Sequence, residues 1–292
     1  MEAIKKVLQS YEEETVAFGL ERDVIRVVGP EAGKYLQGQL TQDIFTMKKN
    51  ESLWSFLLNP DGKVNSWLRV TMVNEDHFLL DVDQAFGQGV LSRLLRFKIR
   101  TDCELSLEKW DWVSVWGRNA YSFSEKSGSQ QISTQSPWSL CDSFDLIGPN
   151  ARLIFQEFPE SQRSYDFMRI LNCVPRMGSE LHEKIIPAET GLIELSVSFT
   201  KGCYTGQELV ARIDSRGNNT PRNLLLIASN HNFSIGNQVE VNEKLAGAIT
   251  SVAKEGDLTV GLAYLSRNVT SPTVGKIEGK EVFVNSPKDF LG

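Results

Sequence analysis

The sequence predicts an α+β protein in which a mixed body of helices and strands is followed by a small antiparallel β-barrel. Up to about residue 216, stretches with the apolar spacing of helices alternate with stretches typical of strands. Beyond Gly217 the helical spacing ends, and short apolar runs between glycine-containing turns favour a barrel. We expect three units, at residues 1–107, 108–216 and 217–292.

The composition is that of a globular protein, with 292 residues, 41% of them hydrophobic and 23% charged. The net charge of −6 gives no global reason to expect binding to nucleic acid or to a membrane. No apolar stretch approaches the ~18 residues of a membrane span, and the acidic run at residues 12–14 does not fit a transit peptide. We therefore expect a cytoplasmic protein with no direct nucleic-acid partner and no membrane partner.

The spacing of the cysteines argues against a zinc site within this chain. They lie far apart and form no C-x-x-C pair, which fits a reducing compartment. The three histidines are isolated as well, so we expect each to be a surface or satisfied core residue rather than a ligand. The four cysteines are Cys103, Cys141, Cys173 and Cys203.

The first unit begins with an N-terminal helix within residues 1–20 and a strand at 23–28. Pro30 follows that strand and suits the first turn of a helix over 31–40. The turn at residues 59–62 has proline and glycine where a tight turn needs them. Strands at 53–58, 63–73, 78–82 and 103–107 and an amphipathic helix at 90–97 complete this unit.

The second unit is predicted to be rich in strands and to reach a helix near its end, and the third to contain strands only. In the second unit we expect strands at 110–116, 144–147 and 152–156 and a helix at 164–171. In the third we expect strands at 223–229, 238–241, 244–253, 257–264 and 280–284.

Residues 199–212 combine a cysteine, a lysine, two glycines and a helix start. Thr205 and Glu208 have the spacing of a capping box, which predicts a helix from Gly206 to about Ile213. Cys203 would then lie just outside the positive end of that helix, two residues from Lys201. Both features favour a thiolate.

The alternative is that Cys203 is a small buried hydrophobe, as most free cysteines are.

The run K-G-C-Y-T-G-Q-E at residues 201–208, followed by Ala211 and Arg212, resembles the signature of the YgfZ-type proteins. These are relatives of the glycine cleavage system T protein, an aminomethyltransferase. The resemblance covers nearly the whole chain, with further matches at residues 29–43, 58–63, 94–99 and 169–189. It implies a T-protein-like, folate-binding body with a central hole, in addition to the C-terminal barrel.

The resemblance also implies a function. The chain would be an accessory protein that supports the assembly, repair or activity of iron–sulfur enzymes, including tRNA-modifying ones. Its partners would be a folate-type small molecule, tetrahydrofolate, and iron–sulfur client proteins. Cys203 would be the working thiol, assisted by Lys201, and a candidate ligand of a transient iron–sulfur cluster shared with another chain. The folate-binding candidates are Tyr204, Gln207, Glu208, Arg212, Glu189 and Trp67.

Two positions depart from the T-protein pattern. Ser66 and Trp67 stand where T proteins carry aspartates, and neither can hold charge beside a folate nitrogen, so we expect no aminomethyl transfer. Leu171 occupies the position of the glutamate that holds the pterin. Glu189 and Glu194 are candidates for a compensating acid, although each is otherwise an ordinary loop carboxylate.

A basic run on the helix at 90–97 and its exit has two interpretations. It meets the acidic tail of a folate electrostatically, or it is a solvated helix face. The run consists of Arg93, Arg96, Lys98 and Arg100.

Two other functions stay open. A folate-dependent aminomethyltransferase or methyltransferase is favoured by the retained fold pattern and opposed by Ser66 and Trp67. A cysteine hydrolase would need a base beside Cys203, which only three scattered histidines could supply.

Overall fold

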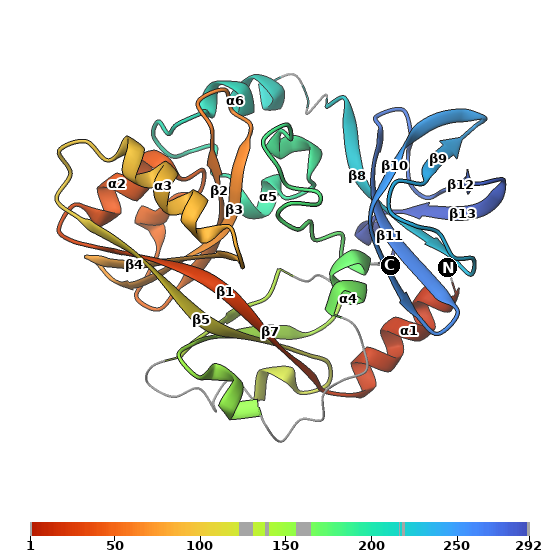
Figure 1. Ribbon diagram of the computed structural model, residues 1–292, viewed down its shortest axis with the longest axis horizontal. Helices are drawn as coiled ribbons and strands as arrows, with labels where there is room; N and C mark the ends of the chain where they lie inside the picture. The colour runs from red at the N-terminus through yellow and green to blue at the C-terminus, as the bar shows by residue number, and fades with distance from the viewer. Residues whose placement is uncertain are drawn as a thin grey trace.

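The protein consists of a mixed body and a closed β-barrel that lie side by side, as Figure 1 shows. The structure is a computed structural model and describes residues 2–122, 131–137, 140–155, 165–215, 217 and 220–290. The predicted α+β body with a C-terminal antiparallel barrel is confirmed.

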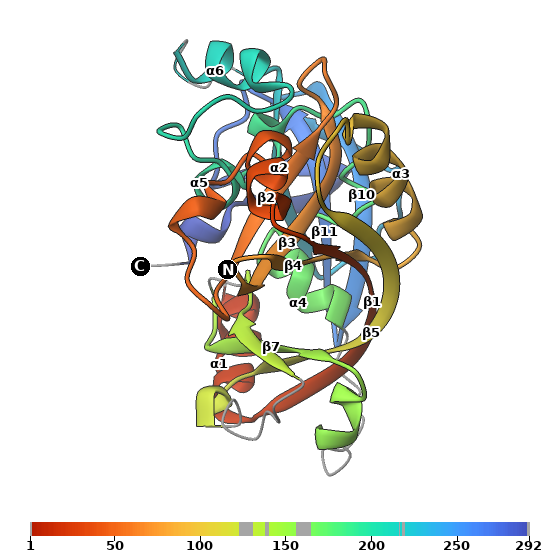
Figure 2. The same ribbon diagram turned by 90° about the vertical axis from the view of Figure 1, so that its left-hand side faces the viewer.

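The body is built on a seven-stranded antiparallel sheet with the order β2-β3-β4-β1-β5-β7-β6. Figure 2 shows β1 and β5 curving along their length, so the sheet has a concave side. The strands are β1 (Val16–Val28), β2 (Ser52–Leu58), β3 (Val64–Asn74), β4 (His77–Asp83), β5 (Glu104–Trp116), β6 (Ile132–Gln135) and β7 (Ser143–Gly148).

Strand β5 crosses the boundary expected between residues 107 and 108. It pairs with β1 along its whole length, from Val28 opposite Glu104 to Val16 opposite Trp116. Because these two strands are continuous, the first two predicted units share one sheet.

Helices and short 3₁₀ turns cover the sheet and connect it to the barrel (Figure 1). The helices are α1 (Glu2–Glu13), α2 (Ala32–Gln39), α3 (Gly87–Phe97), α4 (Tyr165–Leu171), α5 (Ile193–Ser196) and α6 (Gln207–Ser215). Along the chain, α1, α2 and α3 precede β5, and α4, α5 and α6 follow β7. The 3₁₀ turns are η1 (Ile44–Thr46), η3 (Ala151–Phe155), η4 (Pro187–Glu189) and η5 (Pro287–Asp289).

The prediction of a strand at 152–156 is wrong, because Ala151–Phe155 forms the 3₁₀ turn η3 instead. Asn150 takes a positive φ of 58°, and its carbonyl accepts from the Leu153 N–H at 3.0 Å. This turn ends the extended chain directly after β7.

The barrel closes in the order β10-β11-β8-β13-β12-β9. Its strands β8 and β11 are buried on both faces, so they join the barrel to the body. On β8, Leu224 and Leu226 pack into the main core while Leu225 and Ile227 fill the barrel, as the two-residue period of a strand requires. The strands are β8 (Arg222–Ser229), β9 (Gln238–Val241), β10 (Lys244–Glu255), β11 (Leu258–Ser266), β12 (Thr273–Ile277) and β13 (Lys280–Asn285).

Among the residues that the structure describes, no helix is both long enough and apolar enough to cross a membrane.

Candidate functional site

Helix α6 begins at Gln207, one residue later than predicted. The hydrogen bond that caps its N-terminus also differs from the predicted one. The Gln207 side chain accepts a hydrogen bond from the Tyr204 N–H at 3.1 Å. The capping hydrogen bond is therefore between Tyr204 and Gln207, whereas the prediction was a capping box of Thr205 and Glu208. The loop before α6 is fixed further by the Thr205 N–H, which donates to the Gly38 carbonyl at 3.1 Å.

The signature stretch packs directly against the turn at residues 59–62. Gly206 has a φ of +83°, and a Cβ there would lie 2.6 Å from the Asn59 carbonyl oxygen. Gly62 has a φ of +80°, and a Cβ there would lie 2.4 Å from the Leu209 Cβ. Only glycine satisfies both the backbone angle and the close approach at these positions. Two patterns that are far apart in the sequence therefore form one unit.

Lys201 ties the same loop to the end of α2. Its ammonium donates to the carbonyls of Gln37 and Leu40, each at 2.7 Å, and of Gln42 at 2.9 Å. Carbonyls at a helix C-terminus lack partners within the helix, so a cation there is favourable. Burial lowers the pKa of Lys201 to about 8, although Asp43 acts in the opposite direction.

Sequence reasoning expected Lys201 to assist Cys203, and the recorded contacts of its ammonium are with backbone carbonyls. A lysine ammonium has three N–H donors, and three carbonyls accept from Lys201. The side chain holds the loop that carries Cys203 instead of pairing with its sulfur.

Cys203 is the exposed member of four free cysteines. Cys103 is buried, and that burial raises the pKa of its thiol. Burial also raises the pKa of Cys173 to about 12. In the part of the chain that the structure describes, no group of three or more His, Cys, Asp and Glu side chains could hold a metal ion. A cluster bound at Cys203 would need ligands from a second molecule.

Five of the residues expected to bind folate are not among the lining residues of the two cavities described below. Glu189 is buried and joins η4 to the barrel, because it accepts from the Arg222 Nε at 2.8 Å and the Ile186 N–H at 3.2 Å. The other four lie on α6 or the loop before it, and they line neither cavity: Tyr204, Gln207, Glu208 and Arg212. Their contact with folate stays a prediction.

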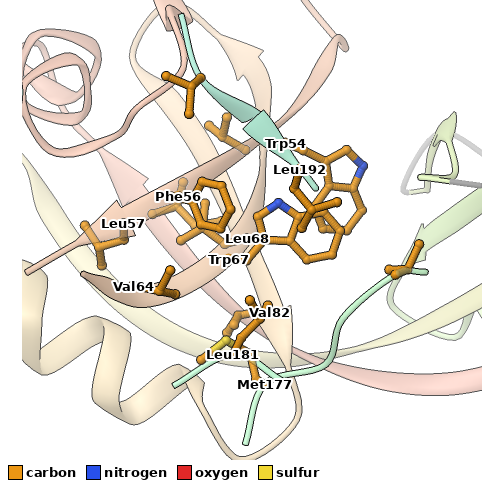
Figure 3. Close-up of a cluster of buried hydrophobic side chains, with 14 of the residues drawn as sticks. Trp54, Phe56, Leu57, Val64, Trp67, Leu68, Val82, Met177, Leu181 and Leu192 are labelled. Carbon is orange, nitrogen blue, oxygen red and sulfur yellow. The ribbon is translucent and has the colours of Figure 1, made fainter. Parts of the chain in front are cut away.

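Trp67 does line a cavity. This first cavity, of about 370 Å³, lies against the sheet and is bounded on its other side by α4 and residues 174–177. The Trp67 ring stacks on Trp54 with 4.0 Å between centroids, and its Nε1–H donates to the Ser196 hydroxyl at 2.9 Å. Figure 3 shows the two rings side by side, with Leu192 next to them. Further aromatic walls come from Phe86, Trp112 and Tyr165.

Two indole N–H groups in this wall have no partner among the residues that the structure describes. Trp54 and Trp112 are 5% and 4% exposed, and the Nε1–H of each is buried without a hydrogen bond to any described residue. A buried donor left unpaired costs on the order of 1–3 kcal/mol.

A network of buried charges lies beside these rings, and the register of the sheet builds it. Arg69 on β3 stands opposite Asp81 on β4, and its Nε donates to Asp81 Oδ1 at 3.0 Å. A second nitrogen of Arg69 donates to Asp145 Oδ2 at 2.7 Å. Arg22 on β1 stands opposite Asp83 and donates to Asp81 Oδ2 at 3.0 Å. Burial opposes the charge of Arg22, yet Asp83 and Asp81 together raise the pKa of its guanidinium.

Asp83 and Arg22 are the members of this network that line the first cavity. The Asp83 side chain is 26% exposed. Arg22 donates to Oδ1, and the Met177 N–H donates to Oδ2 at 3.0 Å. Sequence reasoning missed both Arg22 and Asp83. The available signal was a charged residue inside each of two apolar strands, which normally indicates a solvent-facing position.

Leu171, at the position of the pterin-binding glutamate, is fully buried in the main core and lines neither cavity. Ser66 is fully buried as well. Glu194 lines a second cavity, of about 610 Å³, which shares Trp54, Pro137 and Val174 with the first. The two cavities therefore meet at the Trp54 ring.

The basic run is not a solvated face throughout. Arg93 is buried and donates to the Leu58 carbonyl at 2.9 Å and to Gln39 Oε1 at 3.2 Å. Its guanidinium lies 3.7 Å from the centre of the Phe97 ring. Arg93 thus fastens α3 to the end of β2 and is not available for a folate tail.

No protein-family model matches the chain. An uncharacterized protein of Haemophilus influenzae is 28% identical over 235 residues, covering 78% of this chain and 80% of that protein. The iron–sulfur cluster assembly factor IBA57 homolog, mitochondrial, of Pyricularia oryzae is 27% identical over 252 residues, covering 83% and 64%. The tRNA-modifying protein YgfZ of Aliivibrio fischeri is 24% identical over 274 residues, covering 87% and 86%.

Among solved structures, the glycine cleavage system aminomethyltransferase T from Bartonella henselae superposes with a TM-score of 0.79. The match covers 96% of this chain and 87% of that one. At 18% sequence identity, this likeness establishes a shared fold.

Proposed function

We propose that this chain, a YgfZ-type protein with the fold of the glycine cleavage T protein, is a tetrahydrofolate-binding accessory protein for iron–sulfur enzymes. In this role it supports the assembly, repair or activity of client enzymes, among them enzymes that modify tRNA, and Cys203 is its reactive thiol. The relatives named for iron–sulfur assembly and tRNA modification support the proposal.

The first cavity has the properties that a folate ring needs. Its volume of about 370 Å³ is within the range of small-molecule sites, and its walls combine aromatic side chains with charged ones. The side chains of Trp54 and Trp112 lie in the cavity wall and would pack against such a ring. Bound folate would supply a one-carbon carrier, while the chain's own residues would hold and orient its ring.

Aminomethyl transfer is not part of the proposed role. Ser66 is fully buried, and the Trp67 indole is committed to Ser196. Neither side chain offers the carboxylate that T proteins carry in this strand. An assay for methylene-tetrahydrofolate, with an aminomethyl-loaded carrier protein as substrate, should therefore detect no turnover.

The observation that carries the accessory role is the placement of Cys203. Its thiol is exposed, while Lys201 and Gly206 hold the flanking chain against α2 and the turn at 59–62. Thiolates are the usual ligands of iron–sulfur centres, and one cysteine cannot hold a cluster alone. We therefore infer that Cys203 either shares a cluster with a client protein or exchanges thiol chemistry with it.

The deciding experiment is complementation in cells that lack the chain's counterpart, with the activity of an iron–sulfur enzyme as readout. Cys203→Ala should give no recovery, although its Tm should match that of the wild type. Cys141→Ala is the control and should restore activity. Full recovery with Cys203→Ala would mean that the thiol has no part in the function.

A further inference from the structure

The geometry points to Asp83 as the carboxylate that receives the hydrogen-bond donors of the ligand ring in the first cavity. This inference rests on the folate part of the proposed function and deepens it, because it names the ring edge that the chain recognises. The edge is that of a 2-amino-4-oxo-pyrimidine, in which a ring N–H and an amino group lie side by side.

Three acids line the first cavity, and only one of them is held in a way that suits this role. Glu21 is exposed at the rim, where it accepts from Gln84 Nε2 at 2.5 Å. Asp166 is 40% exposed and already pairs with Arg169 at 2.9 Å and with a second arginine at 3.4 Å. Asp83 lies deeper and projects from a central strand of the sheet.

The oxygens of Asp83 retain acceptor capacity after their contacts within the protein. Oδ1 accepts from Arg22, and Oδ2 accepts from the Met177 N–H. A carboxylate offers about four acceptor positions, so each oxygen keeps one for a ligand. Two parallel donors on a flat ring can then bind both oxygens at once, as a guanidinium does.

The ion pair with Arg22 fixes the orientation of the Asp83 carboxylate, and binding two ligand donors at once requires a fixed carboxylate. Arg22 is 3% exposed and is itself held by Asp81, which also receives Arg69. The cavity-lining carboxylate is therefore fixed by a buried ion network on neighbouring strands. A binding group locked by its own hydrogen bonds loses little freedom when the ligand arrives.

The remaining groups of the cavity match the rest of the same ring. Trp54, Trp67 and Trp112 place aromatic side chains in the wall of the same cavity. The stacked Trp54 and Trp67 rings offer a flat apolar wall to the ring face. Asp83 in this chain thus supplies the carboxylate for the ligand ring, which Leu171 cannot do because it is apolar and fully buried in the core.

The test compares two ligands by calorimetry on the full chain: tetrahydrofolate and the analogue with hydrogen in place of the 2-amino group. The wild type should bind tetrahydrofolate roughly ten- to a hundredfold more tightly, the value of a charged hydrogen bond. Asp83→Asn keeps the shape but turns an acceptor into a donor, so this preference should disappear. Asp111→Asn is the control. Asp111 also lies on the sheet, pairs with an arginine and is 27% exposed, but it lines neither cavity.

Equal binding of the two ligands by the wild type would overturn the inference without any variant, so a poorly folded Asp83→Asn protein does not block the test. A preference that survives in folded Asp83→Asn would overturn it too. Guanosine carries the same ring edge and serves as a third ligand. If the wild type binds guanosine in an Asp83-dependent way and ignores tetrahydrofolate, the inference holds and the folate proposal fails. If neither binds, both fail.

Discussion

Gly206 and Gly62 meet so closely that a Cβ on Gly206 would lie 3.2 Å from the Cα of Gly62. This contact joins the signature stretch to the tight turn between β2 and β3. The position of Cys203 therefore depends on the sheet and not only on its own loop.

Gly206→Ala should lower the free energy of unfolding by about 2 kcal/mol or more. A positive φ in a non-glycine residue and the overlap with Asn59 each cost on the order of 1–3 kcal/mol. Urea denaturation measures the change. Gly202→Ala is the control, since nothing lies within 4 Å of a Cβ there, and it should be nearly neutral. Equal stability of the two variants would contradict the packing described.

Each half of this contact was visible in the sequence, but their meeting was not. The turn at 59–62 and the helix start near Gly206 were predicted from local turn and capping chemistry, which depends on nearby residues only. Their contact depends on the tertiary arrangement, which local patterns do not contain. For the same reason Lys201 was assigned to Cys203, its neighbour in sequence, rather than to the distant end of α2.

The Lys201 clamp should make stability depend on pH. Burial lowers the pKa of Lys201 to about 8 from 10.5, so the unfolded chain binds this proton more tightly than the folded chain does. Between about pH 8 and 10.5 the unfolded state then carries more protons, and the free energy of unfolding should rise with pH.

Lys201→Met keeps most of the side-chain volume and removes the titration. The wild type minus variant difference in unfolding free energy should therefore increase across that pH range. A flat difference would mean that the ammonium titrates alike in both states. At neutral pH the variant should be destabilised, because three carbonyls lose a charged partner.

Cys203 should react with iodoacetamide faster than Cys103 or Cys173 at pH 7–9. Cys203 is exposed, whereas burial raises the pKa of both other thiols, that of Cys173 to about 12. The thiolate is the reacting form, so a raised pKa slows the reaction of Cys103 and Cys173 with iodoacetamide at these pH values. Mass spectrometry of each cysteine against time gives the rates. Comparable rates for all three would contradict the exposure assigned to Cys203.

Leu171→Glu should destabilise the protein by about 3 kcal/mol or more instead of tightening folate binding. Leu171 is fully buried in the main core, where a carboxylate has no described partner. Leu171→Met is the matched control and should cost less than about 1.5 kcal/mol. Thermal unfolding compares them. Tighter tetrahydrofolate binding by a stable Leu171→Glu protein would show that this position does face the ligand.

Strands rich in alternating apolar residues were predicted well, and the short polar ones were not. β6 and β12 carry few apolar residues, so their pairing with longer neighbours is what makes them strands. The charged residues of the site escaped prediction for a related reason. Arg22 and Asp81 become buried, and Asp83 partly buried, only because the curled sheet brings neighbouring strands together around them.

The buried ion network should be far more sensitive to substitution than an exposed pair on the same sheet. Arg69 is fully buried between Asp81 and Asp145, so Arg69→Met leaves two carboxylates without that partner and should cost about 3–5 kcal/mol. Arg26 pairs with Glu108 at 3.2 Å with both side chains over 30% exposed, so Arg26→Met should cost at most about 1 kcal/mol. Urea denaturation of the two variants tests the contrast, and salt should weaken only the Arg26 pair. Similar losses for both would mean that Arg69 gains nothing from its enclosure, and the support assigned to Asp83 would then lose its basis.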